Sequence, residues 1–423
     1  MELRFLGGAQ EVGKSCIAVE TDELRVAMDC GMKVFDHNEG PAVGKLDFDA
    51  CILSHAHLDH SGCLPMLYAH NNIPTFCTFP TAPIVTLLLD DSEKIALQTG
   101  KPLPYTKSDA ARLYRKFTPL PYNLEYEFFD KSKFEFYDAG HIPGSAGVLF
   151  EKKEGGKRKR VFYTGDFNYS DTRLLDKAVF PDDGVDALVI ESTYAFREHP
   201  DRKEMERSFV ESVTDCIDGG NVALVSSFAV GRSQEILLVL NSLLRGKTKV
   251  YYDGMGQKVA NIISDFAAYV RNYRALSSAF SKTGFVEGTD MRRRIMDRPS
   301  VIVTTSGMLE GGPVLSYLQG LNRKGKGKVF LTGYQVEGTN GRALLEGGPL
   351  FINGKKMKVN LPFEHFDFSA HAGAKELREA IRFMNPKKVY CVHGDSCAEF
   401  AQDLRDKDGF DAVAPEIGGK YSV

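Results

Sequence analysis

Four potential metal ligands lie within six residues of the sequence, in the segment His55-Ala-His57-Leu-Asp59-His60. The segment follows the strand-like run 51–54, and residues two apart in an extended chain point the same way. We therefore expect His55 and His57 to share one face, with Asp59 and His60 at the following turn. Imidazole nitrogens and carboxylate oxygens are ligands that zinc accepts at about 2.0–2.2 Å. Three of the ten histidines of the chain are gathered here, which disfavours a polar loop with chance histidines.

Four ligands rarely suffice for two metals, and three further candidates lie in loops or at strand ends. His141 lies in a Gly/Pro-rich loop, Asp166 closely follows the strand-like run 161–163, and His393 ends the last clear strand. Each is a weak signal alone, because a strand-end aspartate is commonly a turn residue and a lone histidine is often structural. Together they complete two coordination shells with one bridging carboxylate. Asp29 also ends a strand, where a turn residue and a residue that orients a ligand histidine are equally good interpretations.

Short apolar, β-branched runs recur along the chain, each followed by a turn and often by a helical pattern. This rhythm predicts an α/β protein. The polar chemistry clusters between residues 29 and 191 and returns between 365 and 395, around a middle stretch with its own strand–helix alternation. We therefore expect one domain inserted into another. The host would comprise residues 1–194 and 356–423, and the insertion residues 195–355.

Length and composition limit the remaining choices. The chain has 423 residues with 43% hydrophobic content, which favours two domains. Its net charge of −3 gives no bulk signal for nucleic acid, so any such contact must come from local patches. The eight cysteines form no C-x-x-C pair and are typical of core residues in a reducing compartment. With no signal sequence and no membrane-spanning apolar run, the sequence predicts a cytoplasmic protein with no membrane partner.

The ligand set as a whole resembles the signature of the metallo-β-lactamase fold. The segment from His55 to His60 carries the resemblance, together with His141, Asp166 and Asp29. It implies a four-layer αββα sandwich with metal ions at the strand ends. Small-molecule hydrolases share this part of the pattern, so it does not name a substrate.

Three further sites resemble motifs A, B and C of the β-CASP nucleases. These are Glu191 in Ile-Glu-Ser-Thr-Tyr, His371 in Phe-Ser-Ala-His-Ala, and His393. The resemblance implies an α/β fold class, an αββα metallo-β-lactamase sandwich with an inserted α/β β-CASP domain. RNA-processing members carry a histidine at motif C, so His393 implies the RNA group. Phe-Ser-Ala-His is similar to the nuclease subunit of the cleavage and polyadenylation specificity factor and its archaeal relatives.

The resemblance implies a zinc-dependent ribonuclease that holds two Zn²⁺ ions bridged by Asp166. The other ligands would be His55, His57 and His141 for the first ion, and Asp59, His60 and His393 for the second. Two metals about 3.5–4 Å apart can share a hydroxide and clamp a phosphodiester, which gives Asp59 a catalytic role as well. His371 would protonate the leaving 3′ oxygen, worth roughly 10²–10⁴-fold, and Glu191 would orient it. The products would carry a 5′ phosphate and a 3′ hydroxyl.

The RNA must also be held away from the metals. Arg232 lies at a predicted strand-to-helix turn, where it could face phosphate; pairing with Glu235 is an equally good interpretation. Ser306, in a Gly-rich segment, could present backbone amides to phosphate or belong to a plain turn. Basic runs occur at three places, of which the first is typical of a solvated hairpin tip, and none is assigned to RNA: residues 157–160, 292–294 and 323–326.

The expected partner is single-stranded RNA, because a narrow cleft between the two domains would exclude a duplex. A homodimer and membership of an RNA-processing complex both stay open, as do endonucleolytic and 5′-to-3′ exonucleolytic action. A small-molecule hydrolase of the same fold would have no use for Glu191 and His371. A DNA nuclease is disfavoured by His393, and a non-catalytic scaffold subunit would be expected to lack ligands.

Overall fold

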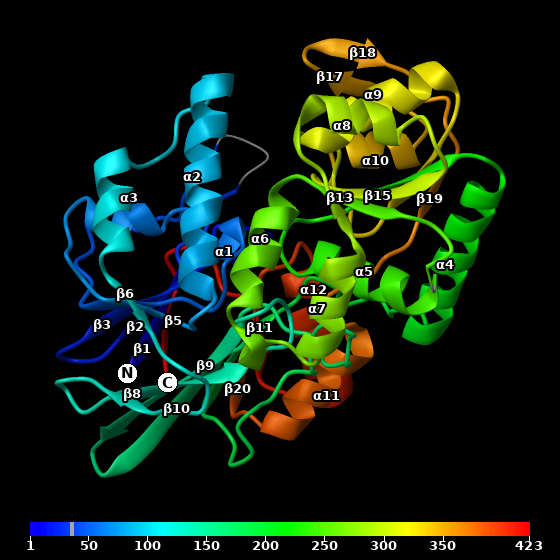
Figure 1. Ribbon diagram of the computed structural model, residues 1–423. Coiled ribbons are helices and arrows are strands. Elements are labelled where there is room, and N and C mark those ends of the chain that lie inside the picture. The colour runs from blue at the N-terminus through cyan, green and yellow to red at the C-terminus, as the bar shows by residue number, and fades with distance from the viewer. Residues whose placement is uncertain (34–37, 245) are drawn as a thin grey trace. The chain divides into compact units, whose positions relative to one another are not determined.

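The computed structural model of the protein describes residues 1–33, 38–244 and 246–423. The chain divides into two compact units (Figure 1). Unit 1 comprises Met1–Asp171, Lys177–Glu198 and His371–Val423. Unit 2 comprises Thr172–Asp176 and His199–Ala370. Unit 2 is therefore contained within the sequence of unit 1.

Unit 2 extends further along the chain than the predicted insertion, residues 195–355. The reason is that strand β19 (Phe363–His365) pairs in parallel with β16 (Lys328–Leu331) of the unit 2 sheet. The domain limits drawn from the sequence stay a prediction, because a compact unit and a family domain need not end at the same residue.

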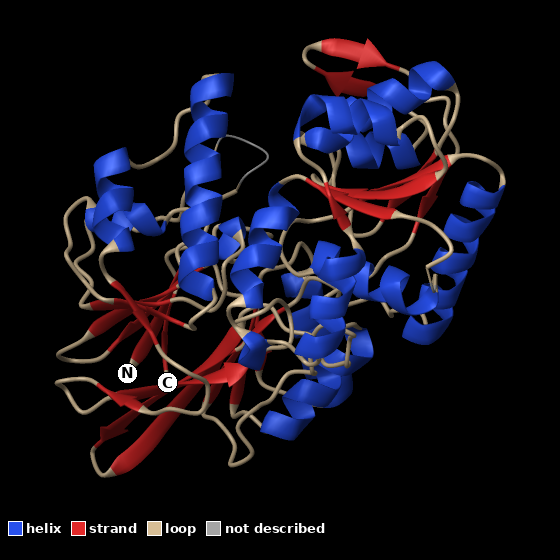
Figure 2. Ribbon diagram, in the orientation of Figure 1, coloured by secondary structure: helices blue, strands red, loops and turns tan. Residues whose placement is uncertain are grey.

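Unit 1 is built on two seven-stranded sheets (Figure 2). The first sheet is parallel from β3 to β6 and antiparallel elsewhere. Its order is β22 (Lys420–Ser422), β1 (Glu2–Gly7), β2 (Cys16–Glu20), β3 (Arg25–Met28), β4 (Ala50–Ile52), β5 (Thr75–Cys77) and β6 (Phe117–Pro119). The second sheet has the order β21 (Ala412–Val413), β20 (Lys388–Val392), β11 (Ala187–Glu191), β10 (Lys157–Tyr163), β9 (Ala146–Glu154), β8 (Lys133–Asp138) and β7 (Tyr126–Glu127).

The two sheets pack face to face around one apolar core. Val26 and Ile52 of the first sheet are buried in the same cluster as Phe134, Phe150 and Val189 of the second. Alternate residues of β11 point to its other face, where helices α11 and α12 cover the sheet. Helices α2 and α3 lie beyond the first sheet (Figure 2). The layer order is therefore helices, sheet, sheet, helices, as the predicted αββα sandwich requires.

Seven helical elements complete the described part of unit 1. They are α1 (Leu58–Ser61), η1 (Leu64–Tyr68), α2 (Thr81–Thr99), α3 (Lys107–Tyr114), α11 (Ala374–Met384), α12 (Cys397–Asp403) and η3 (Leu404–Asp408). In the described parts of both units, no helix combines the length and apolar character that crossing a membrane requires.

Unit 2 is a parallel six-stranded sheet with helices on both faces. Its order is β14 (Gly284–Phe285), β13 (Val250–Asp253), β15 (Ser300–Thr304), β12 (Val222–Ser226), β16 and β19. Along β12, Ala223 and Val225 join one apolar cluster while Val222 and Leu224 join the other, so both faces are buried. The helices are α4 (Arg202–Asp218), α5 (Arg232–Leu243), α6 (Met255–Ser264), η2 (Ala267–Tyr269), α7 (Tyr273–Lys282), α8 (Gly288–Ile295), α9 (Pro313–Lys324) and α10 (Asn340–Leu345). A separate hairpin joins β17 (Leu350–Ile352) and β18 (Lys355–Met357).

Candidate metal centre

The clustered ligands of unit 1 leave the carboxyl end of β4 and enter α1. His55 and His57 lie in the short stretch between these elements, which bends at Ala56 and His57, and Asp59 and His60 lie within the four residues of α1. His55 and His60 are fully or nearly fully buried, with side chains 0% and 1% exposed. The segment is not extended throughout as predicted, but His55 and His57 still belong to one group of neighbouring side chains.

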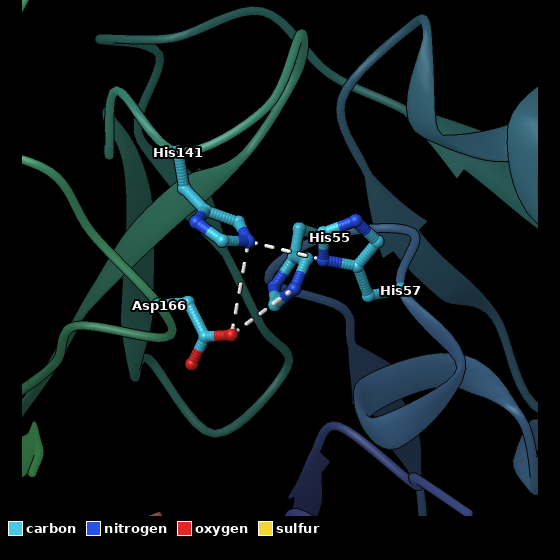
Figure 3. A group of neighbouring side chains, drawn as sticks. All are labelled: His55, His57, His141 and Asp166. Atoms are coloured by element: carbon cyan, nitrogen blue, oxygen red, sulfur yellow. Dashed lines mark hydrogen bonds and ion pairs between the residues drawn. The ribbon is translucent and has the colours of Figure 1, made fainter. Parts of the chain in front are cut away.

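One group of four side chains could hold the first metal ion: His55, His57, His141 and Asp166 (Figure 3). Nε2 of His141 lies 3.0 Å from Nδ1 of His57 and 3.8 Å from Oδ2 of Asp166. Nε2 of His55 lies 3.5 Å from the same carboxylate oxygen. Ligands placed about 2.0–2.2 Å from a tetrahedral ion are about 3.3–3.6 Å from one another. The observed separations of 3.0, 3.5 and 3.8 Å lie on both sides of this range, within a few tenths of an ångström of what a shared tetrahedral ion needs.

A second group shares Asp166 and consists of Asp59, His60, Asp166 and His393. Nε2 of His60 lies 3.2 Å from Oδ1 of Asp166, and Nε2 of His393 lies 3.6 Å from it. Nε2 of His393 is also 3.6 Å from Oδ2 of Asp59. The two oxygens of Asp166 thus face different groups, as a bridging carboxylate between two ions would.

The protonation of His55 and Asp166 suits metal ligation. Burial, reinforced by the neighbouring charge of His60, holds the pKa of His55 well below its usual value, so the ring is neutral. Nε2 of His55 is buried and has no hydrogen-bond partner among the described residues. Burial alone would raise the pKa of Asp166, but the facing His393 and His60 outweigh it and hold the pKa well below its usual value. A neutral imidazole with an unpaired buried nitrogen beside an ionised carboxylate is the donor set that a divalent cation requires.

Asp29 holds His60 in place from behind. Its Oδ2 lies 2.7 Å from Nδ1 of His60 and accepts hydrogen bonds from Ser54 Oγ and Tyr163 Oη, each also at 2.7 Å. Burial opposes a charge on His60, but Asp166 and Asp29 outweigh it and raise its pKa well above the usual value. Because Nδ1 of His60 is engaged by Asp29, Nε2 is directed at Asp166.

Ser15 plays the corresponding part for His393, and sequence reasoning missed it. Its Oγ lies 2.9 Å from Nδ1 of His393 and 3.5 Å from Nε2 of His60. Ser15 and His393 are separated by 378 residues. Ser54 and Tyr163 were also missed as partners of Asp29. Ser54 adjoins the histidine motif and could have been found, whereas Ser15 carries no local signal.

A third group, Asp166, Glu191 and His371, adjoins the first two through Asp166. Nδ1 of His371 lies 2.8 Å from Oε2 of Glu191, and Oε1 of Glu191 accepts a hydrogen bond from the backbone N–H of Phe167. Burial opposes protonation of His371, but Glu191 and Asp166 outweigh it and raise its pKa to about 9. Its ring lies 4.7 Å from that of His141, measured between ring centroids. The structure therefore brings His371 and Glu191 directly beside the candidate metal ligands.

Comparison with known proteins identifies the family. A metallo-β-lactamase superfamily domain matches residues 18–192, a Beta-Casp domain residues 233–344, and a Zn-dependent metallo-hydrolase RNA specificity domain residues 356–415. The protein named "Probable RNase MJ4" of Methanocaldococcus jannaschii is 38% identical over 100% of both chains. The chain belongs to the β-CASP family of the metallo-β-lactamase fold. The family and the fold class expected from the motifs are confirmed.

Other β-CASP relatives are similar to this chain in sequence over most of their length. "RNase aCSPSF2" of Saccharolobus solfataricus is 34% identical over 100% of this chain and 85% of that protein. "Transcription termination factor FttA" of M. jannaschii is 35% identical over 96% of this chain and 69% of that protein. A crystal structure of a protein of unknown function from Enterococcus faecalis V583 superposes with a TM-score of 0.62 at 14% identity, covering 100% of this chain and 99% of that one. That likeness supports the fold alone.

The two predicted phosphate contacts of the β-CASP chain lie in unit 2. Arg232 is the first residue of α5, and Ser306 lies in the loop after β15. Oγ of Ser306 accepts hydrogen bonds from the N–H groups of Glu310 and Gly311, as in a turn. The loop after β15 adjoins the loop between β12 and α5, since a Cβ on Gly307 would lie 3.0 Å from the backbone nitrogen of Phe228. A contact of either residue with RNA stays a prediction.

Proposed function

We propose that the protein is a zinc-dependent ribonuclease that hydrolyses the phosphodiester bonds of single-stranded RNA, leaving a 5′ phosphate and a 3′ hydroxyl. The observation that carries the proposal is the shared position of Asp166. Its carboxylate belongs to both four-residue ligand groups and also to the group that contains His371. A proton donor therefore stands beside a centre suited to two ions, an arrangement that can hydrolyse a phosphodiester.

We assign the two zinc ions to the two ligand groups. His55, His57, His141 and Asp166 would hold one ion, and Asp59, His60, Asp166 and His393 the other. When bound, the ions would lower the pKa of a water molecule bound to them to about neutral pH. They would also neutralise charge on the phosphate oxygens. Asp29 and Ser15 would orient His60 and His393.

The chain's own contribution to bond breaking is the delivery of a proton. As water attacks phosphorus, the bond to the 3′ oxygen breaks and that oxygen needs a proton. Glu191 engages Nδ1 of His371, so Nε2 is the atom that would give the proton. Glu191 also binds the N–H of Phe167, next to Asp166, and thereby ties the acid to the ligand loop. This arrangement serves endonucleolytic and 5′-to-3′ exonucleolytic cleavage alike.

RNA is favoured as substrate over the alternatives. Residues 356–415 match a domain described as an RNA specificity domain, and two full-length relatives carry RNase in their names. A small-molecule hydrolase would have no use for the Glu191–His371 pair, and a DNA nuclease is disfavoured by His393. We propose the single strand because a buried metal pair is hard for a duplex backbone to reach.

The test combines metal content with substrate choice. The purified protein should contain about two zinc ions and cleave 5′- and 3′-labelled single-stranded RNA faster than duplex RNA, DNA or a thioester. Asp59→Ala combined with His60→Ala should lose mainly one ion and nearly all cleavage, whereas His70→Ala, an exposed histidine outside the three groups, should change neither. Two ions retained in the double variant would refute the coordination scheme. Preferential cleavage of the thioester would refute the function.

A further inference from the structure

The β17–β18 hairpin of unit 2 presents one outward face. Asn353 and Gly354 form its turn, both with positive φ (51° and 73°), the conformation of a tight two-residue hairpin. Leu350 and Ile352 are 0% and 4% exposed, so their side of the strands packs on the unit 2 core. Phe351 points the other way and is 58% exposed.

Phe351 is held in this position by a buried amide. Asn340 of α10, only 7% exposed, accepts a hydrogen bond from the N–H of Phe351 at 2.6 Å. Its Nδ2 donates to the carbonyl of Phe351 at 3.0 Å and to that of Leu309 at 3.0 Å. The aromatic ring therefore stands on a backbone that is fixed on both sides. An exposed ring on a hydrogen-bonded backbone is a surface on which a flat group can stack.

One cation lies against this ring. Lys356 is the cross-strand partner of Phe351, and its Nζ lies 5.6 Å from the ring centroid. Lys358, one residue beyond β18, is exposed as well, whereas the exposed Lys355 pairs with Ile352 and belongs to the other side of the hairpin. The side chain of Asn322 bonds the carbonyl of Lys358 and the N–H of Asn360, which joins the hairpin to the end of α9.

Two more exposed cations are Arg323, near the end of α9, and Lys326, two residues beyond it. Among the residues that the structure describes, no acidic side chain forms an ion pair with either of them or with the three hairpin lysines, whereas Lys324 pairs with Asp297 at 2.6 Å. We call five side chains together the hairpin surface: Phe351, Lys356, Lys358, Arg323 and Lys326. Four unpaired cations in a chain of net charge −3 favour a polyanionic partner.

We propose that the hairpin surface binds a single strand of the substrate RNA, a site additional to the metal ligands and to Arg232 and Ser306. The lysines and the arginine contact backbone phosphates, and an unpaired base stacks on Phe351. Single strands are recognised through this combination of cationic and aromatic side chains, because only an unpaired base exposes its face. The proposal rests on the proposed function for its choice of RNA, but binding can be measured without cleavage.

The test uses the zinc-loaded protein and a labelled single-stranded RNA with phosphorothioate linkages, which resists cleavage while affinity is measured. Phe351→Ala and Phe351→Leu should both weaken binding about 5- to 150-fold, the loss of one stacked base. The same variants should bind a strand with abasic sites as the unaltered protein does. Lys356→Ser with Lys358→Ser should lower the slope of log affinity against log salt by about 1.4, since each phosphate contact on a single strand contributes about 0.7.

The matched control is Phe129→Ala with Lys131→Ser in unit 1, which removes an exposed ring and a lysine that pairs with Glu127. This control should bind RNA as the unaltered protein does. Cleavage of a trinucleotide, too short to need a second surface, should be unchanged in every variant. Unchanged affinity and unchanged slope in the hairpin variants would overturn the proposal. Equally tight binding of polyglutamate, insensitive to Phe351→Leu, would also overturn it and indicate an acidic protein partner. Failure of the proposed function would show differently, as absence of trinucleotide cleavage by the unaltered protein.

Discussion

The metal centre of unit 1 and the hairpin surface of unit 2 differ in whether their polar side chains have partners within the protein. At the metal centre, Asp29 and Ser15 each engage a ring nitrogen of a ligand histidine, and the opposite nitrogen faces Asp166. At the hairpin surface, Lys356 and its neighbours point into solvent without an acidic partner in the described chain. The buried donors are arranged for an ion of fixed geometry, while the exposed cations suit a flexible polyanion. We therefore expect changes in unit 1 to alter metal content or rate, and changes at the hairpin to alter affinity and its salt dependence.

The largest effect that separates the two regions should come from the proton donor. His371→Ala should lower the cleavage rate by roughly 10²–10⁴-fold while zinc content and RNA affinity stay the same. The reason is that His371 pairs with Glu191 and is not a member of either four-residue ligand group. Single-turnover kinetics with metal analysis on the same sample measures this.

A chemical control tests the assignment of His371. An RNA analogue whose leaving group is stable without a proton should restore much of the rate to His371→Ala, because the task of the acid is then removed. A variant that loses zinc together with activity would instead make His371 a metal ligand. Either a normal rate or an absent rescue would contradict its role as the acid.

A smaller effect is expected from the residue that orients His60. Asp29→Ala should weaken zinc binding about 10- to 100-fold, because Asp29 fixes the ring through Nδ1. Tyr163→Phe removes one of the hydrogen bonds to the same carboxylate oxygen and should have a smaller effect. Competition with a chromophoric chelator measures both affinities. Equal affinities in Asp29→Ala and the unaltered protein would show that the ligand histidines orient themselves.

The ligands of the metal centre could be predicted because their signals are local. Four of the ligands lie within the six residues from His55 to His60, and Asp166 and His393 each follow a strand whose last residues are buried. Ser15 could not be found in this way. It reaches His393 only because the first sheet and the second sheet pack face to face, and no short window of sequence contains that packing.

The basic runs show what composition alone misjudges. The run at 157–160 forms the expected hairpin after Gly155 and Gly156, which have positive φ. The three lysines at 355–358 were not predicted to form a basic surface, although Asn353-Gly354 before them is a strong hairpin signal. The number of cations is similar in the two hairpins and does not distinguish them. They differ in whether the facing strand carries acidic side chains that pair with the cations, and this pairing depends on the strand register.

The smallest expected effect compares these two hairpins directly. Arg158 bonds Glu151 in the facing strand β9, and Lys159 lies 3.4 Å from Glu154, so each cation already has a carboxylate partner. Arg158→Ser with Lys159→Ser should therefore leave the salt slope of RNA binding unchanged, although it removes as much positive charge as Lys356→Ser with Lys358→Ser. Fluorescence anisotropy over a salt series measures both slopes on one labelled single strand. A slope lowered by about 1.4 in both pairs would mean that RNA responds to total charge and not to unpaired cations at a defined surface. A slope lowered only in the β17–β18 pair would place the phosphate contacts on unit 2, where the exposed ring of Phe351 can hold a base beside them.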